Sequence, residues 1–267
     1  MTPVRLKEAY LALLIKTLTA SVYVESGWNR FYNHKSMIVK FVIWFFDKFN
    51  ISLVKRNSFN FSYRNEGTDW PMFGFTMTGI KRMTFLKNAI INVIEKKIPG
   101  DLFEAGVWRG GSSILMKAVL DLYDDDRRVI LADSFEGMPK PKGILDGFDL
   151  SDNKYLAVSL DEVKANFDKF ELLDEKIVFI KGWFCDSLPL INKTSISILR
   201  LDGDLYSSTM DVLVNLYDLV SVGGYIIIDD YHSWPQCKKA VHDFFYSRHI
   251  DISLIDIDQD SAYLIKK

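Results

Sequence analysis

Four aspartates follow two apolar runs in the second half of the sequence. They are, in chain order, Asp202, Asp204, Asp229 and Asp230. A buried carboxylate is costly without a compensating cation or donor, so two strands that both end in acid predict one shared site at a sheet edge. Converging carboxylates suit a hard cation such as Mg²⁺, which lowers the pKa of a bound hydroxyl, and a carboxylate off the cation can accept the proton. The competing interpretation is that one acid, above all Asp204, only caps the following helix.

A glycine-rich turn lies upstream of these acids. Residues 104–111 read Glu-Ala-Gly-Val-Trp-Arg-Gly-Gly, which departs from the G-x-G-x-x-G of dinucleotide sites because Trp108 takes the second glycine position. The acid before the turn, Glu104, would repel a pyrophosphate but not a ligand with an ammonium group. Asp133 ends the next apolar run, roughly 20 residues on, where a carboxylate accepts hydrogen bonds from ribose hydroxyls. Together these features favour S-adenosylmethionine over NAD.

An alternation of strands and helices must position these residues. Short apolar runs predict strands, and apolar side chains at intervals of three and four predict helices. The predicted strands are 102–104, 129–132, 177–180, 196–201, 225–228 and a closing hairpin of 252–257 with 262–265; the predicted helices are 5–24, 84–97, 112–123, 159–170, 208–220 and 236–248. Ser112 or Ser113 is the expected N-cap of its helix. The pattern predicts an α/β fold, a doubly wound, mostly parallel seven-stranded sheet with one antiparallel edge.

The N-terminal third is expected to form a helical cap or lid region, residues 1–98, on a main domain of residues 99–267. The run 37–46 is apolar and rich in aromatic side chains but too short to span a membrane. Packing on the main domain is its favoured interpretation, with a dimer contact and a membrane-surface helix as alternatives. The wider segment 28–63 is predicted to shape the acceptor pocket or a subunit contact.

Composition limits the partners. The 267 residues include 33 basic and 35 acidic ones, a net charge of −2, which gives no electrostatic reason to bind nucleic acid. The two cysteines, Cys185 and Cys237, have no metal-ligand spacing, and no signal peptide or membrane-spanning run is recognised. We therefore expect reduced thiols in a cytoplasmic protein.

Several motifs closely resemble those of the macrocin O-methyltransferase family. They are FEAGVWRGGSS at 103–113, ADSFEGMP at 132–139, LRLDGDLYSST at 199–209 and IDDY at 228–231, with Asp69-Trp70-Pro71 and Thr76-Met77 in a lid-like region. The likeness runs from about residue 6 to the C-terminus. It implies a Rossmann-like class I methyltransferase fold and a metal- and S-adenosylmethionine-dependent enzyme that methylates sugar hydroxyls, chiefly on natural products. A homo-oligomer is also expected.

The resemblance also implies roles for single residues. Asp202, Asp229 and Asp230 match the metal ligands, for Mg²⁺ or another hard divalent cation, and Asp204 matches the general base. With the positions expected from the glycine turn and strand ends, the predicted cofactor residues are Thr76, Met77, Glu104, Gly106, Asp133, Ser134, Phe135, Gly182, Trp183 and Asp202. The acceptor stays open between a glycosylated natural product and a surface glycan.

Three other classes remain open at this point. A nucleotide-binding oxidoreductase is disfavoured by the broken glycine pattern and leaves the pair at 229–230 without a role. A non-catalytic binding module would bind cofactor without turnover, and the intact acid cluster argues against it. A catechol-type O-methyltransferase would use a similar metal site on a flat aromatic diol, and only the longer motifs favour a sugar.

Overall fold

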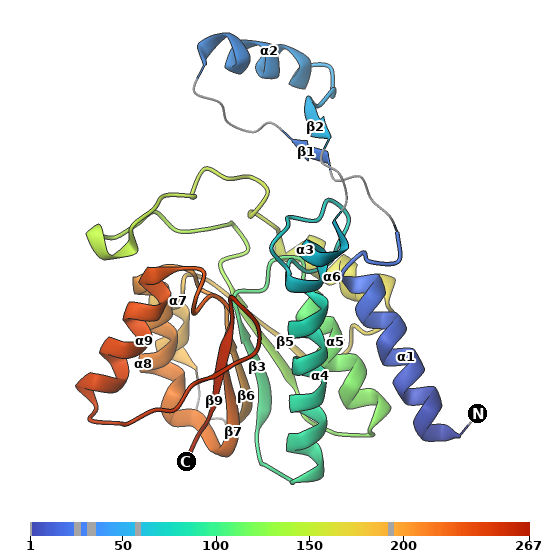
Figure 1. The fold of residues 1–267 in the computed structure, drawn as a ribbon, viewed down its shortest axis with the longest axis vertical. Coiled ribbons are helices and arrows are strands. Elements are labelled where there is room, and N and C mark those ends of the chain that lie inside the picture. The colour runs from blue at the N-terminus through green and yellow to red at the C-terminus, as the bar shows by residue number, and fades with distance from the viewer. Residues whose placement is uncertain (1, 24–27, 31–35, 57–59, 192–194) are drawn as a thin grey trace.

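The computed structural model contains a seven-stranded sheet with helices on both faces (Figure 1). It describes residues 2–23, 28–30, 36–56, 60–191 and 195–267. The strands are β3 (Asp101–Ala105), β4 (Val129–Asp133), β5 (Ile177–Lys181), β6 (Ile196–Leu201), β7 (Val220–Ile228), β8 (Ile255–Asp256) and β9 (Ala262–Ile265). Their order is β5-β4-β3-β6-β7-β9-β8. The first five strands are parallel, and β9 pairs antiparallel with β7 and β8, so the predicted fold class and closing hairpin are confirmed.

Each face of the sheet has its own hydrophobic core. One face packs on α1 (Pro3–Leu18), α4 (Ile80–Glu95), α5 (Gly111–Leu122) and α6 (Leu160–Lys169). The other face packs on α7 (Phe184–Ser187), α8 (Tyr206–Leu216) and α9 (Pro235–Ser247). Side chains alternate along β6, with Ile198 on the α4 side and Leu199 and Leu201 on the α8 side. Arg200 therefore shares the α4 side with Ile198.

The termini of several helices differ from the sequence-based expectation. The N-cap of α5 is Gly110, at φ 86°, and not Ser112 or Ser113. The hydroxyl of Ser113 instead donates to the Glu104 carboxylate. Helix α1 ends at Leu18 rather than near residue 24, and a residue beyond the cap, Ala20, has φ 53°. A left-handed residue ends the run of helical backbone there, although the apolar spacing continues.

Helix α8 begins two residues before its predicted start, because a distant side chain caps it. The backbone N–H and the hydroxyl of Ser207 both donate to the carboxylate of Asp146, at 2.8 and 3.0 Å. Asp146 is itself 2% exposed and belongs to the 3₁₀ turn Ile144–Asp146. The loop after β4 thus fixes the first turn of α8, which begins two residues after Asp204.

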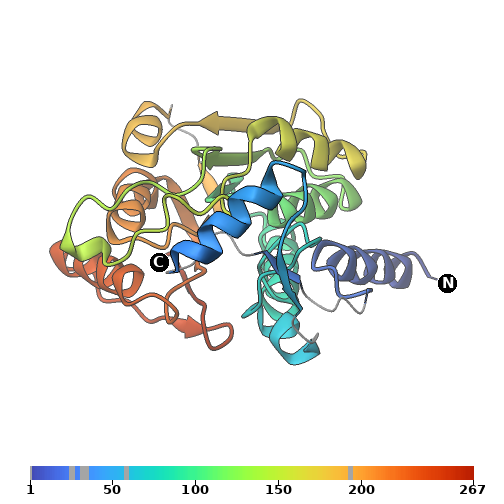
Figure 2. The ribbon, with the colours of Figure 1, turned by 90° about the horizontal axis from the view of Figure 1, so that it is seen from above.

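The small N-terminal elements lie beyond the carboxyl edge of the sheet (Figure 1). They are β1 (Trp28–Arg30), α2 (Met37–Asp47), β2 (Val54–Arg56) and α3 (Phe61–Glu66), and β1 pairs antiparallel with β2. Seen from above, α2 lies over the middle of the molecule (Figure 2). The division at residues 98 and 99 stays a prediction, since α1 and α4 share one core with α5.

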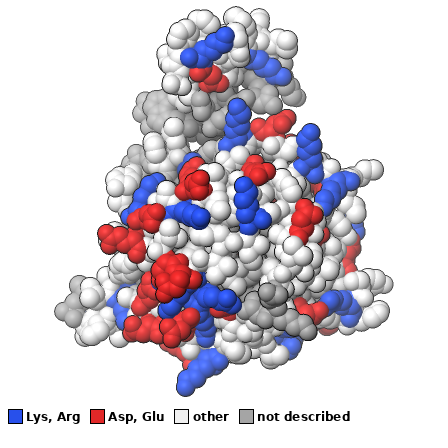
Figure 3. Space-filling model, turned by 180° about the vertical axis from the view of Figure 1, so that it is seen from behind, with Lys and Arg blue, Asp and Glu red and all other residues white. Residues whose placement is uncertain are grey.

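Helix α2 buries none of its residues, so the favoured interpretation of this run, packing on the main domain, is wrong. Phe41 is 62% and Trp44 52% exposed. The dimer contact and the membrane-surface helix stay predictions. Among the described helices, none has both the length and the apolar character needed to cross a bilayer. On the rear face, basic and acidic side chains are interspersed (Figure 3).

Two phenylalanines provide a matched test of the exposed position of α2. Phe167 of α6 is 0% exposed, so Phe167→Ala should lower the free energy of unfolding by about 3–5 kcal/mol. Phe41→Ala removes the same atoms from the exposed surface of α2 and should cost less than about 1 kcal/mol. Urea unfolding followed by circular dichroism measures both. Equal losses in the two variants would contradict the exposed position of α2.

Candidate active site

A cavity of about 360 Å³ opens at the carboxyl edge of the parallel strands. Its walls come from the turn after β3, the end of β4, the loop that follows β4, the start of α7 and the turn between β6 and α8. The predicted site residues that line it are Met77, Gly106, Asp133, Ser134, Trp183, Asp202 and Asp204. Its size lies within the usual range of small-molecule sites, and parallel α/β sheets bind ligands at this edge.

The turn after β3 lies against the end of β6. Gly106 has φ 92°, and a Cβ atom added to it would lie 1.9 Å from the backbone oxygen of Asp202. The backbone N–H of Asp202 donates to the oxygen of Ala105 at 2.8 Å, which continues the ladder between the two strands. Only glycine fits this approach, so the backbone itself brings the turn and the acid together.

Asp133 organises the same turn from the neighbouring strand. Its Oδ2 accepts from the backbone N–H of Val107 at 2.7 Å, and its Oδ1 accepts from that of Phe135 at 2.8 Å. Burial raises the pKa of Asp133, and these N–H donors oppose the rise. The carboxylate still lines the cavity, where a ribose hydroxyl can reach it.

Three of the four aspartates gather at the β6 and β7 ends. One carboxylate oxygen from each of Asp202, Asp204 and Asp230 lies within 4.8 Å of the other two. Burial and the nearby Asp202 charge raise the pKa of Asp204 to about 7. Burial and the Asp204 charge also raise the pKa of Asp230. Oδ2 of Asp230 is buried and accepts no hydrogen bond from the described residues, which leaves it free for a cation.

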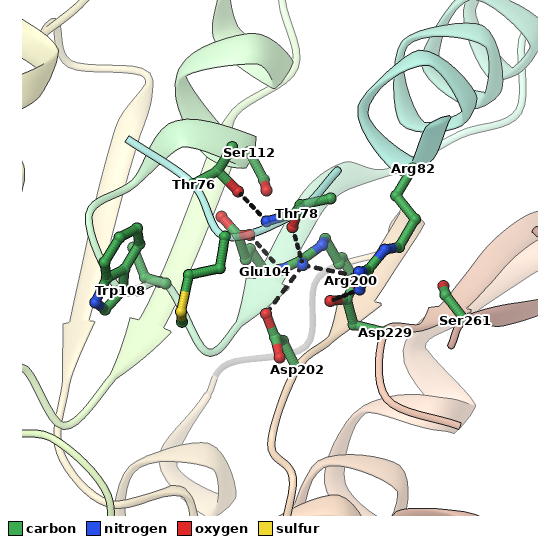
Figure 4. A network of polar contacts seen from close by, with 12 residues as sticks. Thr76, Thr78, Arg82, Glu104, Trp108, Ser112, Arg200, Asp202, Asp229 and Ser261 are labelled. Carbon is green, nitrogen blue, oxygen red and sulfur yellow. Dashed lines mark hydrogen bonds and ion pairs between the residues drawn. The ribbon is translucent and has the colours of Figure 1, made fainter. Parts of the chain in front are cut away.

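Asp229 faces a different environment. Its Oδ2 lies 2.7 Å from Arg82 of α4, and its Oδ1 lies 2.8 Å from Arg200 of β6 (Figure 4). Burial raises the pKa of Asp229, but the Arg200 and Arg82 guanidinium groups outweigh this and hold it below its usual range. The structure therefore brings Asp202, Asp204 and Asp230 together and places Asp229 against two arginines.

Arg200 is the centre of a buried polar network (Figure 4). It is 3% exposed, and its guanidinium lies 2.7 Å from Glu104 and 2.9 Å from Asp202. It also donates to the hydroxyl of Thr78 at 2.9 Å. Burial raises the pKa of Glu104 to about 7, although Arg200 and the Ser113 hydroxyl both lower it.

The remaining predicted residues do not line the cavity. Glu104 is 1% exposed and enclosed by Arg200 and Ser113. Phe135 is buried in the core. Thr76 accepts from the backbone N–H of Thr78 at 3.0 Å. Gly182 donates its N–H to the oxygen of Asp133 at 2.9 Å and follows β5. Their roles in cofactor binding stay predictions.

The comparisons with known proteins agree over almost the whole chain. The Macrocin-O-methyltransferase (TylF) family model matches residues 7–266. The chain is 41% identical over 263 residues to Demethyldecarbamoylnovobiocin O-methyltransferase of Streptomyces niveus, which covers 95% of this chain and 92% of that protein. This chain belongs to the macrocin O-methyltransferase family.

Further relatives support the same assignment. The chain is 37% identical over 219 residues to Mycinamicin III 3''-O-methyltransferase of Micromonospora griseorubida, over 79% of this chain and 86% of that protein. The solved structure of the O-methyltransferase NovP matches with a TM-score of 0.83 at 40% identity, over 97% of this chain and 99% of that one. The protein is thus an O-methyltransferase with the fold of the S-adenosylmethionine-dependent enzymes. The alternative of a nucleotide-binding oxidoreductase is wrong.

Neither arginine of the network, Arg82 or Arg200, was predicted from the sequence as a site residue. Arg200 had a signal, because it is the one charged residue within the apolar run 196–201 and immediately precedes Asp202. A lone cation in a buried strand needs a carboxylate partner, and Glu104 stands at the end of another predicted strand. Arg82 had no such signal, since its position in α4 resembles that of any helical arginine.

Without a bound metal ion, the free energy of unfolding of this protein should fall as the pH rises from about 5 to about 8. The pKa of Asp204 is raised to about 7, and that of Asp230 is raised in the same sense. The unfolded carboxyls ionise near pH ~4, so the folded state binds more protons between these values. The stability from the neutral Asp204 and Glu104 carboxyls is complete below pH ~4 and is lost as the pH passes through about 7.

Urea unfolding in EDTA across this pH range measures the effect. Asn at position 204 cannot ionise, so Asp204→Asn should reduce the pH dependence, while Glu104 and Asp230 retain part of it. The lowered pKa of Asp229 acts in the opposite sense, but its contribution is lost only below pH ~4, outside this window. An unfolding free energy that rises from pH ~5 to pH ~8 would contradict the arrangement.

A substitution at one position can test whether the glycine turn requires glycine. Gly106→Ala places a Cβ against the Asp202 backbone oxygen and forces the turn and the strand apart. The dissociation constant of S-adenosylhomocysteine, measured by calorimetry, should rise at least about tenfold. Gly143→Ala is the matched control, because no atom lies within 4 Å of its added Cβ. Equal affinities in the two variants would show that the turn tolerates a side chain.

Proposed function

We propose that this protein transfers a methyl group from S-adenosylmethionine to a sugar hydroxyl of a glycosylated natural product or surface glycan. Mg²⁺ or another hard divalent cation assists at Asp202, Asp229 and Asp230, and Asp204 is the general base. The observation that carries the proposal is the acid cluster, which adjoins the cavity. The acceptor class is supported by a relative from Streptomyces olivaceus that is named for methylating a rhamnosyl-tetracenomycin. We also expect a cytoplasmic homo-oligomer.

The residues around the cavity fit the cofactor. The Asp133 carboxylate can accept from ribose hydroxyls, and the Gly106 turn leaves room for a close approach of the ligand to the backbone. Trp183 and Met77 supply apolar surface for an adenine and a sulfonium methyl group. Glu104 is enclosed by Arg200 and Ser113 and does not line the cavity. Its proposed effect on the amino-acid end of the cofactor is therefore indirect, through its negative charge.

The donor set fits a hard cation. It consists only of carboxylates, which suits Mg²⁺ or Mn²⁺ rather than a soft metal. The Asp230 oxygen that accepts no hydrogen bond among the described residues gives such a cation a ready ligand. Asp202 can join it if it shares its carboxylate with Arg200. Asp229 can join it if it shares its carboxylate with both Arg82 and Arg200. A bound cation would supply Lewis-acid stabilisation of a developing alkoxide.

The chain's own residues then position the reaction and move the proton. Asp204 lies in the turn between β6 and α8, lines the cavity and has a pKa of about 7, well placed for a general base near neutral pH. Asp146 holds the first turn of α8, which keeps the Asp204 backbone in place. The cavity would hold the cofactor and the acceptor close together, and this positioning would provide most of the acceleration.

A direct assay tests the proposal. The purified chain is incubated with S-adenosylmethionine, Mg²⁺ and demethylated glycosides, beginning with the substrates for which the relatives are named. Mass spectrometry should show one added methyl group on the sugar and EDTA should abolish it. Asp230→Asn should lower both the rate and the Mn²⁺ affinity. Asp204→Asn should lower kcat by about 10²–10⁴-fold with Mn²⁺ affinity kept within about threefold.

Each part of the proposal has its own contradicting result. Full activity in EDTA would contradict the role of the cation. A large loss of Mn²⁺ affinity in Asp204→Asn, with no loss in Asp229→Asn, would make Asp204 the third ligand in place of Asp229. Transfer to catechols without transfer to any glycoside would leave the reaction type standing and replace the acceptor class.

A further inference from the structure

The cofactor side and the cation side of the site share one buried guanidinium. Glu104 and Arg200 are direct register partners on the parallel strands β3 and β6, so their side chains leave the same face next to each other. The ion pair between them measures 2.7 Å. The strand pairing itself, and not a flexible loop, therefore fixes this contact.

The same guanidinium reaches the acids of the cation side. Its second nitrogen lies 2.9 Å from Asp202 and 2.8 Å from Asp229, the first residues after β6 and β7. The Thr78 hydroxyl accepts from that nitrogen too. All three acids contact the same charge, and Arg200 is 3% exposed, while Asp202 itself lines the cavity and its side chain is 30% exposed. A second arginine, Arg82, supports only Asp229 of this set.

We propose that Arg200 is a positioning residue through which Glu104 and the cation-binding acids influence each other. Weakening its contact with Glu104 leaves the guanidinium more available to Asp202 and Asp229, where it competes with a divalent cation. The inference rests on the proposed function, since it takes these acids as the cation site and Glu104 as part of the cofactor side. Coupling between two ligand sites is reciprocal in binding free energy.

The test uses the full chain with Mn²⁺ as the probe, titrated by electron paramagnetic resonance without cofactor or acceptor. Glu104→Gln keeps the shape of the side chain and removes its charge. It should weaken Mn²⁺ binding at least about fivefold, although Glu104 lies outside the acid cluster. Asp101→Asn is the matched control, since it removes a carboxylate at the opposite end of the same strand, β3, where it pairs with Arg128, and should change Mn²⁺ affinity less than about twofold.

A double-mutant cycle assigns the effect to Arg200. Arg200→Lys keeps the charge, but a single ammonium group cannot span three carboxylates as the planar guanidinium does. Adding Glu104→Gln to this variant should change Mn²⁺ affinity less than about twofold, which means that the coupling is lost. Melting temperatures establish that each variant is folded. If Arg200→Lys does not fold, the comparison of Glu104→Gln with Asp101→Asn decides alone.

The outcomes separate this inference from the proposed function. A wild-type chain that binds neither Mn²⁺ nor S-adenosylhomocysteine would overturn both. A wild-type chain that binds both, with Mn²⁺ affinity unchanged in Glu104→Gln, would overturn only the role of Arg200. An equal loss in Glu104→Gln and Asp101→Asn would show a general effect of removing charge and would likewise overturn it. A Glu104→Gln effect that persists in full beside Arg200→Lys would do the same.

Discussion

The burial of one arginine among several carboxylates is the constraint on which the site depends. Arg200 is the single charge within the fully buried strand β6, and burial alone would strongly disfavour it. The surrounding acids reverse this, so that its pKa lies well above the ordinary value. The acids depend on Arg200 in turn, because without it Glu104, Asp202 and Asp229 would be neighbouring negative charges in a medium of low dielectric.

This constraint explains the arrangement of the surrounding elements. Strands β3, β6 and β7 are adjacent and parallel, so their carboxyl ends deliver the partners of Arg200 to one edge of the sheet. The segment before α4 contributes the Thr78 hydroxyl, and α4 itself contributes Arg82. Arg82 also bonds the backbone oxygens of Glu66 and Gly67, which ties the N-terminal segment to the same network. Regions far apart in the sequence thus meet around a few buried charges.

The sequence predicted the sheet and the cavity edge well because both follow from local patterns. Apolar runs that end in Asp133, Asp202 and Asp229 are visible without any knowledge of the fold. The details that depend on distant contacts were less accessible. The start of α8 depends on Asp146, and the partners of Asp229 depend on α4, which precedes it by more than a hundred residues. The exposure of α2 was missed because an apolar helix reads the same whether or not something covers it.

The contact between Gly106 and the Asp202 backbone bears on how this enzyme could be redesigned. Two stretches of main chain meet there on one wall of the cavity, with no side chain between them to exchange. The loop that follows β4 is a part of the wall that can be exchanged, because Gly137, Met138, Pro139, Lys140 and Lys142 line the same cavity without forming part of the sheet. A library confined to that loop would vary what the cavity recognises while the contact between the turn and the strand end stays constant.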